Sequence, residues 1–82
     1  MGQNYLNEQI SVLAKFDRGQ ITPLCFKIKK RLIRIDSIDL RYKYRQDNVN
    51  FHSFSVSAAG NSYKLSYNCL TLEWFLEEIF TD

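Results

Sequence analysis

The residues with the clearest chemical potential in this chain are the alternating cations and rings at positions 41–45. Arg41, Lys43 and Arg45 alternate with two tyrosines, so on a β-strand the three cations would share one face and the tyrosines the other. Cations beside aromatic rings suit single-stranded nucleic acid, because the charges follow the phosphates while the bases stack on the rings. The candidate nucleic-acid contacts are Lys27, Lys29, Lys30, Arg41, Lys43 and Arg45.

The same alternation weakens this interpretation. It places Tyr42 and Tyr44 opposite the cations, with the apolar residues, and leaves a solvated strand face that bears three positive charges. The net charge of the chain is only +2, far from the strongly basic balance expected of a nucleic-acid-binding domain. A single-stranded nucleic-acid-binding β-barrel is therefore the alternative function and not the leading one.

Charge is distributed unevenly along the chain. Residues 1–45 hold ten of the eleven lysines and arginines but only four of the nine acidic residues. Such a basic half and acidic half could steer a charged partner. They could equally neutralise each other once the strands interleave in the fold.

No set of residues has the spacing of a catalytic site. His52, the single histidine, lies beside Ser53 and Ser55, but no positioned acid or nucleophile elbow accompanies it. Asp36 and Asp39 are three positions apart and would point to opposite faces of a strand, so they are read as turn or edge charges. The chain is expected to be non-catalytic and to use no cofactor.

The two cysteines, Cys25 and Cys69, are far apart and belong to no CxxC motif. In a reducing compartment the expected state is a pair of buried or half-buried thiols. A zinc site needs four ligands, and one histidine with two separated cysteines does not supply them. No metal site is expected.

The length of 82 residues fits one small domain. Residues 1–9 are polar and are expected to form a flexible lead, with residues 10–82 as a single β domain. The lead has no basic start or apolar run typical of a signal peptide. No stretch approaches the roughly 20 apolar residues of a membrane-spanning helix. The expected location is the cytoplasm, without membrane association.

Apolar residues recur at every second position through most of the chain. This is the period of half-buried β-strands, which are the elements that would position the residues above. This period predicts a first strand over residues 10–16, a turn at 17–20 and a second strand over 24–28. Pro23 is expected at the first residue of that strand or on a sheet edge. Further strands are expected over residues 31–36, 38–44, 52–57 and 62–68.

Two features refine this expectation. Lys29-Lys30 is expected to be the loop of a hairpin in which Phe26 faces Ile33 and Leu24 faces Ile35. A longer loop is the open alternative, because Lys-Lys lacks the Asn-Gly chemistry that a two-residue turn prefers. The apolar phase then shifts from odd to even positions, which predicts a bulge or bend near Asp36-Ser37. The resulting fold class is an all-β, five- or six-stranded antiparallel barrel or curled sheet.

The C-terminal segment fits two structures. Leu72, Trp74 and Leu76 alternate as in a strand, whereas Leu72, Phe75, Leu76 and Ile79 match one face of a helix. A closing strand is favoured, with a short helix after Leu76 as the open alternative. In a strand, Trp74 would face inward and Phe75 outward.

Outward-facing apolar residues give the leading functional hypothesis. Leu13, Leu32 and Phe75 are out of phase with the predicted core and would form an exposed apolar patch, which in small proteins marks an interface. Open sheet edges also invite strand addition by a partner. The chain is therefore expected to be an interaction module that contacts an unidentified protein or a second copy of itself.

Residues 14–24 read AKFDRGQITPL and are similar to the AKFD-x-x-G-x-ITPL-like start of a family of short uncharacterised proteins of Gram-positive bacteria. The resemblance continues through residues 33–38 and returns at residues 74–77, close to that family's terminal WF-x-E-like segment. Relatives usually have a tryptophan at the position of Ile28 and an Asp-Gly turn at Lys29-Lys30. The resemblance implies a strand at the tryptophan segment but no activity and no functional residue.

Overall fold

The computed structural model describes the backbone of residues 2–81 and the side chains of residues 6–81. Its strands are β1 (Gly2–Asp17), β2 (Gln20–Ile28), β3 (Arg31–Arg34), β4 (Ser37–Gln46), β5 (Val49–Ala58), β6 (Asn61–Asn68) and β7 (Trp74–Thr81). They form one antiparallel sheet in the order β3-β2-β1-β7-β6-β5-β4. The all-β curled-sheet class is confirmed, but the described residues form seven strands, not five or six, and no helix.

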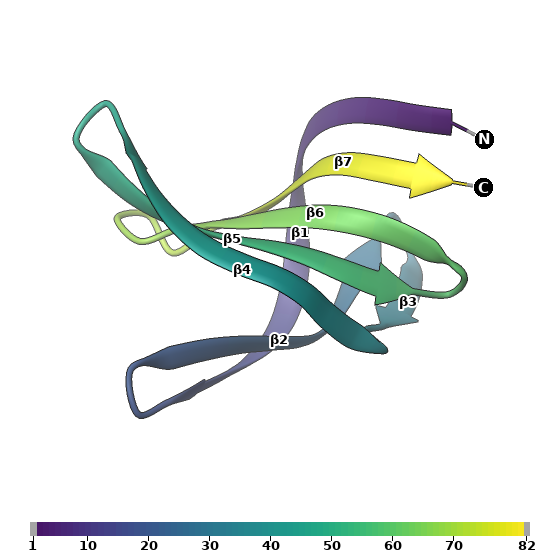
Figure 1. Ribbon diagram of the computed structural model, residues 1–82, viewed down its shortest axis with the longest axis horizontal. Helices are drawn as coiled ribbons and strands as arrows, with labels where there is room; N and C mark the ends of the chain where they lie inside the picture. The colour runs from purple at the N-terminus through teal and green to yellow at the C-terminus, as the bar shows by residue number, and fades with distance from the viewer. Residues whose placement is uncertain (1, 82) are drawn as a thin grey trace.

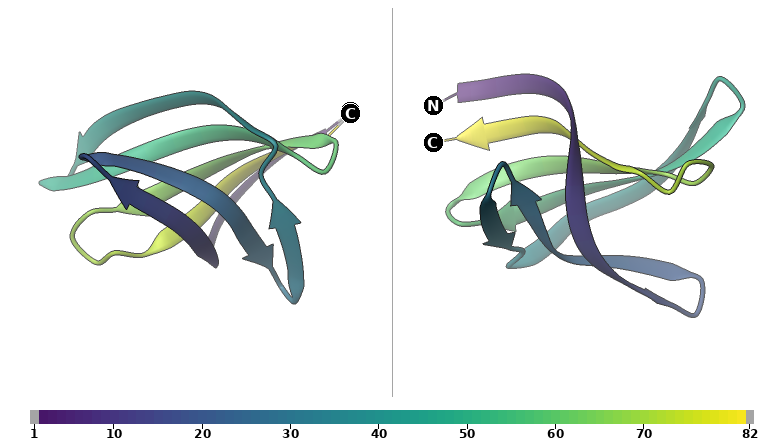
Figure 2. Two further views of the ribbon diagram at one scale, coloured as in Figure 1. Left: turned by 90° about the horizontal axis from the view of Figure 1, so that it is seen from below. Right: turned by 180° about the vertical axis from the view of Figure 1, so that it is seen from behind.

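The sheet curls into a half-barrel (Figures 1 and 2). β3 and β4 are the two edge strands, although only Ile35 and Asp36 separate them in the chain. The Ile35 N–H donates to the carbonyl oxygen of Leu24 in β2 at 3.0 Å, and the Asp36 N–H donates to that of Ser57 in β5 at 2.8 Å. This link joins the two sides of the sheet, while β2 and β4 do not pair with each other. We call the unpaired stretch between β4 and the start of β2 the seam.

The hydrophobic core covers the inner face of the curl. Burial of apolar area is the dominant favourable term in folding, and here aromatic rings supply much of it. Phe26 packs edge-on against Tyr63 at 5.0 Å between ring centroids, and Trp74 lies 4.9 Å from Tyr67. The buried apolar side chains are Ile10, Ile21, Phe26, Ile33, Phe54, Val56, Ala58, Tyr63, Leu65, Tyr67, Trp74 and Leu76.

The first strand is longer than expected, and the C-terminal segment is a strand and not a helix. The segment expected to be a flexible lead is instead the first part of β1, since residues 2–5 and 8–10 pair with β7; Met1 lies outside the described residues. The C-terminal segment is a strand from Trp74 to Thr81, so the favoured strand is confirmed and the helix alternative is wrong. Trp74 is buried, and Leu72, which has φ 65°, precedes the strand and is exposed.

A bulge at Asp39 decides which face each β4 side chain occupies. Ile38 pairs with Val56 and Leu40 with Ser55, so Asp39 is the extra residue. Its carboxylate accepts hydrogen bonds from the hydroxyls of Ser37, at 2.9 Å, and Ser57, at 2.5 Å. These bonds lower the pKa of Asp39. An extra residue inverts the alternation of side chains that follow it.

The expectation that Tyr42 and Tyr44 lie on the apolar face is therefore wrong. Tyr42 pairs with Ser53 and Tyr44 with Phe51, and both tyrosines lie on the outer face of the sheet. The expected bend at residues 36–37 is present as the link between β3 and β4. Sequence alternation missed the second irregularity, three residues further along.

Pro23 lies at a second bulge. Ala14 pairs with Pro23 while Leu13 pairs with Cys25, so Leu24 is the extra residue in β2. Pro23 lies inside β2 and is not its first residue. β3 pairs with β2 only from Cys25 to Ile28, so Pro23 lies in the part of β2 that has no β3 neighbour. A bulge on an unpaired edge tolerates a residue without an N–H donor. Within the described residues no helix is long and apolar enough to cross a membrane.

The hairpin turns are tight and adopt left-handed backbone conformations. Arg18-Gly19, Asp47-Asn48 and Ala59-Gly60 each have positive φ at both residues, the geometry of the two-residue type I′ turn. The turn at residues 17–20 and the Phe26–Ile33 pair are confirmed. In the Lys29-Lys30 turn only the first residue has positive φ, at 57°. This position favours glycine, which avoids the steric cost that a side chain pays there.

Lys29→Gly should therefore stabilise the protein. Removing the side chain relieves a left-handed strain of about 1–2 kcal/mol, against a glycine entropy cost of about 0.5–1 kcal/mol. We expect a net gain of about 0.5 kcal/mol in the free energy of unfolding, measured by urea denaturation. Lys30→Gly is the matched control and should lose stability, because Lys30 is outside the left-handed region. Equal effects of the two substitutions would contradict this account of the turn.

Candidate functional site

Two cations of β4 lie on the inner face of the sheet, beside aromatic rings. After the Asp39 bulge, Arg41 pairs with Phe54 and Lys43 pairs with His52. The guanidinium carbon of Arg41 is 5.9 Å from the centroid of the Phe54 ring, within cation–π range. The bulge therefore puts these cations and rings together, an arrangement that uninterrupted alternation forbids.

The tip of the β1–β2 hairpin forms the opposite wall of this site. Arg41 Nη1 donates a hydrogen bond of 3.1 Å to the carbonyl oxygen of Ile21, across the seam. Two adjoining cavities of about 280 and 290 Å³ share Gly19, Gln20, Ile21 and His52. We call the combined depression the seam groove; the side chains that matter below are Phe16, Arg18, Ile21, Arg41, Lys43, His52 and Phe54.

Aromatic rings form a continuous series along this groove. His52 lies 6.4 Å from both Phe54 and Tyr67, measured between ring centroids. Phe16 reaches Tyr67 from β1 in an edge-on contact at 5.7 Å. Although it belongs to the inward-facing phase of β1, Phe16 is 59% exposed. A large ring exposed beside a cavity offers a stacking surface for a planar ligand.

The electrostatics of the seam groove favour an anion. In the part of the chain whose side chains the structure describes, the two cavities are lined by three cations, Arg18, Arg41 and Lys43, and by one acid, Asp17. Burial and the nearby charge of Lys43 lower the pKa of His52 below its ordinary value of 6.5. His52 is thus neutral at pH 7 and presents an uncharged ring.

This depressed pKa makes stability depend on pH in a defined direction. The unfolded chain binds a proton at His52 more readily than the folded one, so the stabilising contribution is present above about pH 6.5 and is lost as the pH falls. We expect the His52 ring protons to titrate with a midpoint below 6.5 by NMR. We also expect His52→Gln to flatten the fall in unfolding free energy between about pH 7 and 5. A midpoint above 6.5 would contradict the burial of this ring beside Lys43.

The six cations expected to contact nucleic acid do not form one patch. Arg41 and Lys43 are in the seam groove, whereas Lys27 and Lys29 line a separate cavity that includes Glu8. The Lys29-Lys30 turn is eight residues along β2 from Ile21, a separation of about 25 Å in a strand. Arg45 is exposed further along β4, opposite Asn50.

The three residues expected to form a protein interface are also divided. Leu13 and Leu32 are 63% and 66% exposed. They lie on the outer face of β1 and β3, opposite Cys25 and Lys27 of β2. Phe75 is half-buried on the outer face of β7, where it pairs with Ser66 of β6.

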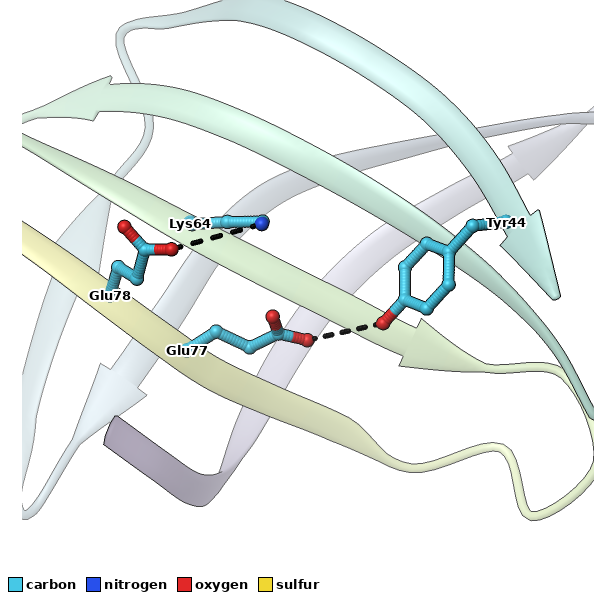
Figure 3. A network of polar contacts seen from close by, with 4 residues as sticks. All are labelled: Tyr44, Lys64, Glu77 and Glu78. Carbon is cyan, nitrogen blue, oxygen red and sulfur yellow. Dashed lines mark hydrogen bonds and ion pairs between the residues drawn. The ribbon is translucent and has the colours of Figure 1, made fainter. Parts of the chain in front are cut away.

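A polar network occupies the outer face beyond Phe75. The Tyr44 hydroxyl donates to a Glu77 carboxylate oxygen at 3.4 Å, and Lys64 Nζ lies 3.8 Å from Glu78 (Figure 3). Burial and the charge of Glu77 raise the pKa of Tyr44. Tyr44 thus remains a hydrogen-bond donor at neutral pH.

The remaining reactive residues do not assemble into a site within residues 6–81. His52 lies on the inner face, while Ser53 faces the opposite side of β5. Cys25 and Cys69 are free thiols, both half-buried. No group of three or more His, Cys, Asp or Glu side chains gathers in this part of the chain to hold a metal ion.

The fold and the groove define a small antiparallel β module with a half-open barrel. Comparisons with protein-family models, with curated proteins and with solved structures find no match to the chain. The resemblance to the Gram-positive family at residues 14–24 and 74–77 therefore stays a prediction.

Proposed function

We propose that this chain is a non-catalytic binding module and that its seam groove holds a short stretch of single-stranded nucleic acid. The observation that carries the proposal is that Arg41 and Lys43 share a face with Phe54 and His52. This arrangement removes the geometric objection raised by the alternation of cations and tyrosines in β4.

The chemistry of the groove matches both parts of a nucleotide. Arg41 and Lys43 on one wall and Arg18 on the other supply positive charge for phosphates. The exposed ring of Phe16 supplies a surface on which a base can stack. His52 lines both cavities, and its lowered pKa keeps it neutral at pH 7. Its uncharged ring can stack on a base or form a hydrogen bond with it, with no buried positive charge on the ring.

Strand addition by a protein at β4 is less well supported. β4 is an edge strand of ten residues, but it carries Arg41, Lys43 and Arg45, is bulged at Asp39 and is bonded across the seam by Arg41. Charged residues and bulges on an edge are the means by which β proteins prevent further strand pairing. The same cations thus oppose an added strand and favour an anionic ligand.

Fluorescence anisotropy of a labelled single-stranded oligonucleotide tests the proposal. With about three phosphates neutralised, log K should fall with log salt at a slope near −2, from about −0.7 per phosphate on single strands. Duplex DNA of the same length should bind more weakly, because its bases are not available for stacking. Anisotropy that stays flat with DNA and RNA at low salt would refute the proposal.

A second candidate, protein contact through the outer face of β1–β3, is supported by the exposure of Leu13 and Leu32. Leu24, at the bulge of the intervening strand β2, is 44% exposed. Exposed apolar residues that form a contiguous patch mark interfaces. Light scattering over a concentration series tests self-association, which Leu13→Ser with Leu32→Ser should abolish. A monomer at all concentrations would leave a different protein as the partner, to be sought by cross-linking that the same double variant should prevent.

A further inference from the structure

A second groove lies on the outer face of the sheet and differs in chemistry from the seam groove. It encloses a cavity of about 340 Å³. Phe51 of β5 and Phe75 of β7 line it on either side of β6, where the buried Ser66 forms the floor. Because neighbouring strands are about 4.8 Å apart, ring-bearing strands on either side of β6 stand about 10 Å apart. We call this depression the outer groove.

The charges of the outer groove are acidic. Among the side chains of residues 6–81, its ionisable lining residues are Asp47, in the β4–β5 turn, and Glu77 of β7, and no lysine or arginine lines it. The Phe51 ring is itself stacked on Tyr44, with centroids 5.0 Å apart and planes 7° from parallel. Carboxylates between aromatic faces attract cations, because the face of a ring carries negative electrostatic potential.

The next position along β6 shows which cation this face accommodates. Lys64 is two residues before Ser66 and lies on the same outer face. Its ammonium nitrogen is 5.9 Å from the centroid of the Tyr42 ring and 3.8 Å from the Glu78 carboxylate. The hydrogen bond to Tyr42, together with Glu77 and Glu78, raises the pKa of Lys64. Figure 3 shows Lys64 and Glu78 beside the Tyr44–Glu77 pair.

Lys64 and Ser66 are thus successive positions on the same face of β6. At the first, a ring on the β4 side, a lysine on β6 and a carboxylate on β7 come together. At the second, rings and a carboxylate flank a serine, whose short side chain leaves room for a cation from another molecule.

We propose that the outer groove binds one alkylammonium group, of the kind carried by a lysine side chain of another protein. The Phe51 and Phe75 rings contact the methylene chain, and the ammonium lies near Glu77 and Asp47. Lys64 with Tyr42 and Glu78 is the intramolecular counterpart of this arrangement. The proposal concerns the face opposite the seam groove and does not depend on nucleic-acid binding.

A titration of the whole protein by two-dimensional ¹H–¹⁵N NMR tests the proposal. The probes are n-butylammonium and, as the neutral isostere, n-butanol, at matched ionic strength. We expect saturable shifts at the amides of Asp47, Ser66 and Phe75 with the ammonium, with a dissociation constant in the range of about 1–10 mM for so small a ligand. The alcohol should give no saturable shift. Equal responses to both probes, or no response at these amides, would overturn the proposal.

Two variants and a matched control separate the site from general charge. Glu77→Gln should weaken n-butylammonium binding at least about fivefold, because the carboxylate supplies the attraction. Glu73→Gln removes the same charge outside the groove and should leave binding unchanged. If Glu77→Gln disturbs the fold by altering the Tyr44 contact, Asp47→Asn provides the second test, since asparagine tolerates the φ of 51° at that turn. Equal weakening by Glu73→Gln and Glu77→Gln would contradict the site.

The source of the ammonium is resolved by two further ligands. A short peptide with a single lysine should produce the same shifts as n-butylammonium, and Phe75→Leu should weaken its binding. If spermidine binds well and the peptide does not, the ligand is a free amine and the protein-borne lysine is refuted. Oligonucleotide anisotropy of Glu77→Gln should equal that of the wild type, so the two proposals can fail separately.

Discussion

The double variant Arg41→Ala, Lys43→Ala should lose about tenfold or more in affinity for a single-stranded oligonucleotide at about 50 mM salt. Both cations face the seam groove, on the same side of the sheet as Phe54 and His52. Removing two of the three cations should make the salt slope shallower by about 1.4, from about 0.7 per phosphate. The measurement is fluorescence anisotropy across a range of salt concentrations.

The matched control is Lys29→Ala with Lys30→Ala. It removes the same net charge from the opposite end of β2, about 25 Å along the strand from Ile21. If binding used overall charge alone, both double variants would weaken it equally. That result would contradict a defined groove, whereas loss confined to Arg41 and Lys43 would support it. Circular dichroism of both variants checks that the fold is intact.

Phe26→Ala should destabilise the protein by about 3–5 kcal/mol. Phe26 is 1% exposed, pairs with Ile33 and packs edge-on against Tyr63. It therefore holds the β2–β3 hairpin onto the core through contacts that alanine cannot make. A chain of 82 residues has a total stability of about 4–12 kcal/mol. Urea denaturation should accordingly show a loss of about a quarter or more of the free energy of unfolding, up to all of it.

Phe16→Ala is the control for this substitution. Phe16 is 59% exposed and contacts Tyr67 at its edge, so its removal should cost no more than about 1 kcal/mol. If Phe26→Ala leaves too little folded protein to measure, Phe26→Leu should give a measurable loss of about 1 kcal/mol. A similar cost for Phe26→Ala and Phe16→Ala would contradict the assignment of Phe26 to the core.

Much of the fold follows from local sequence patterns. Period-two alternation and turn residues specify hairpins. They were enough to predict the Arg18-Gly19 turn, the Lys29-Lys30 hairpin and the strand at Trp74. The length of the first strand could not be predicted. Residues 2–9 have no alternating apolar pattern, and they extend β1 through pairing with β7, which is distant in sequence.

The candidate site was only partly predictable, for a single physical reason. Arg41 and Lys43 are evident in the sequence as cations on one strand face, but which face they occupy depends on Asp39. Asp39 is the bulged residue, and its carboxylate accepts hydrogen bonds from Ser37 and Ser57. Ser57 is 18 residues away in the sequence. A polar residue breaking an apolar phase is a weak signal of such a bulge. Phe16 and His52 join the site through the curl of the sheet, which no local pattern specifies.

On the outer face, the direction of one side chain was predicted correctly, but the groove that it lines was not. Phase alone predicted that Phe75 points outward, and it does so, opposite Ser66. Its neighbours in the outer groove come from the β4–β5 turn and from β5 and β6. Sequence therefore gave the direction of one ring but not the pocket that this ring lines.

The central claim is that the cations of β4 and the rings of the inner face bind one ligand together. Mapping ¹H–¹⁵N NMR shifts during titration with a short single-stranded oligonucleotide tests this most directly. The account predicts that shifts concentrate at the amides of Gly19, Ile21, Arg41, Lys43 and His52, with those of the Lys29-Lys30 turn unchanged. Shifts centred on that turn, or spread evenly over all cations, would contradict it.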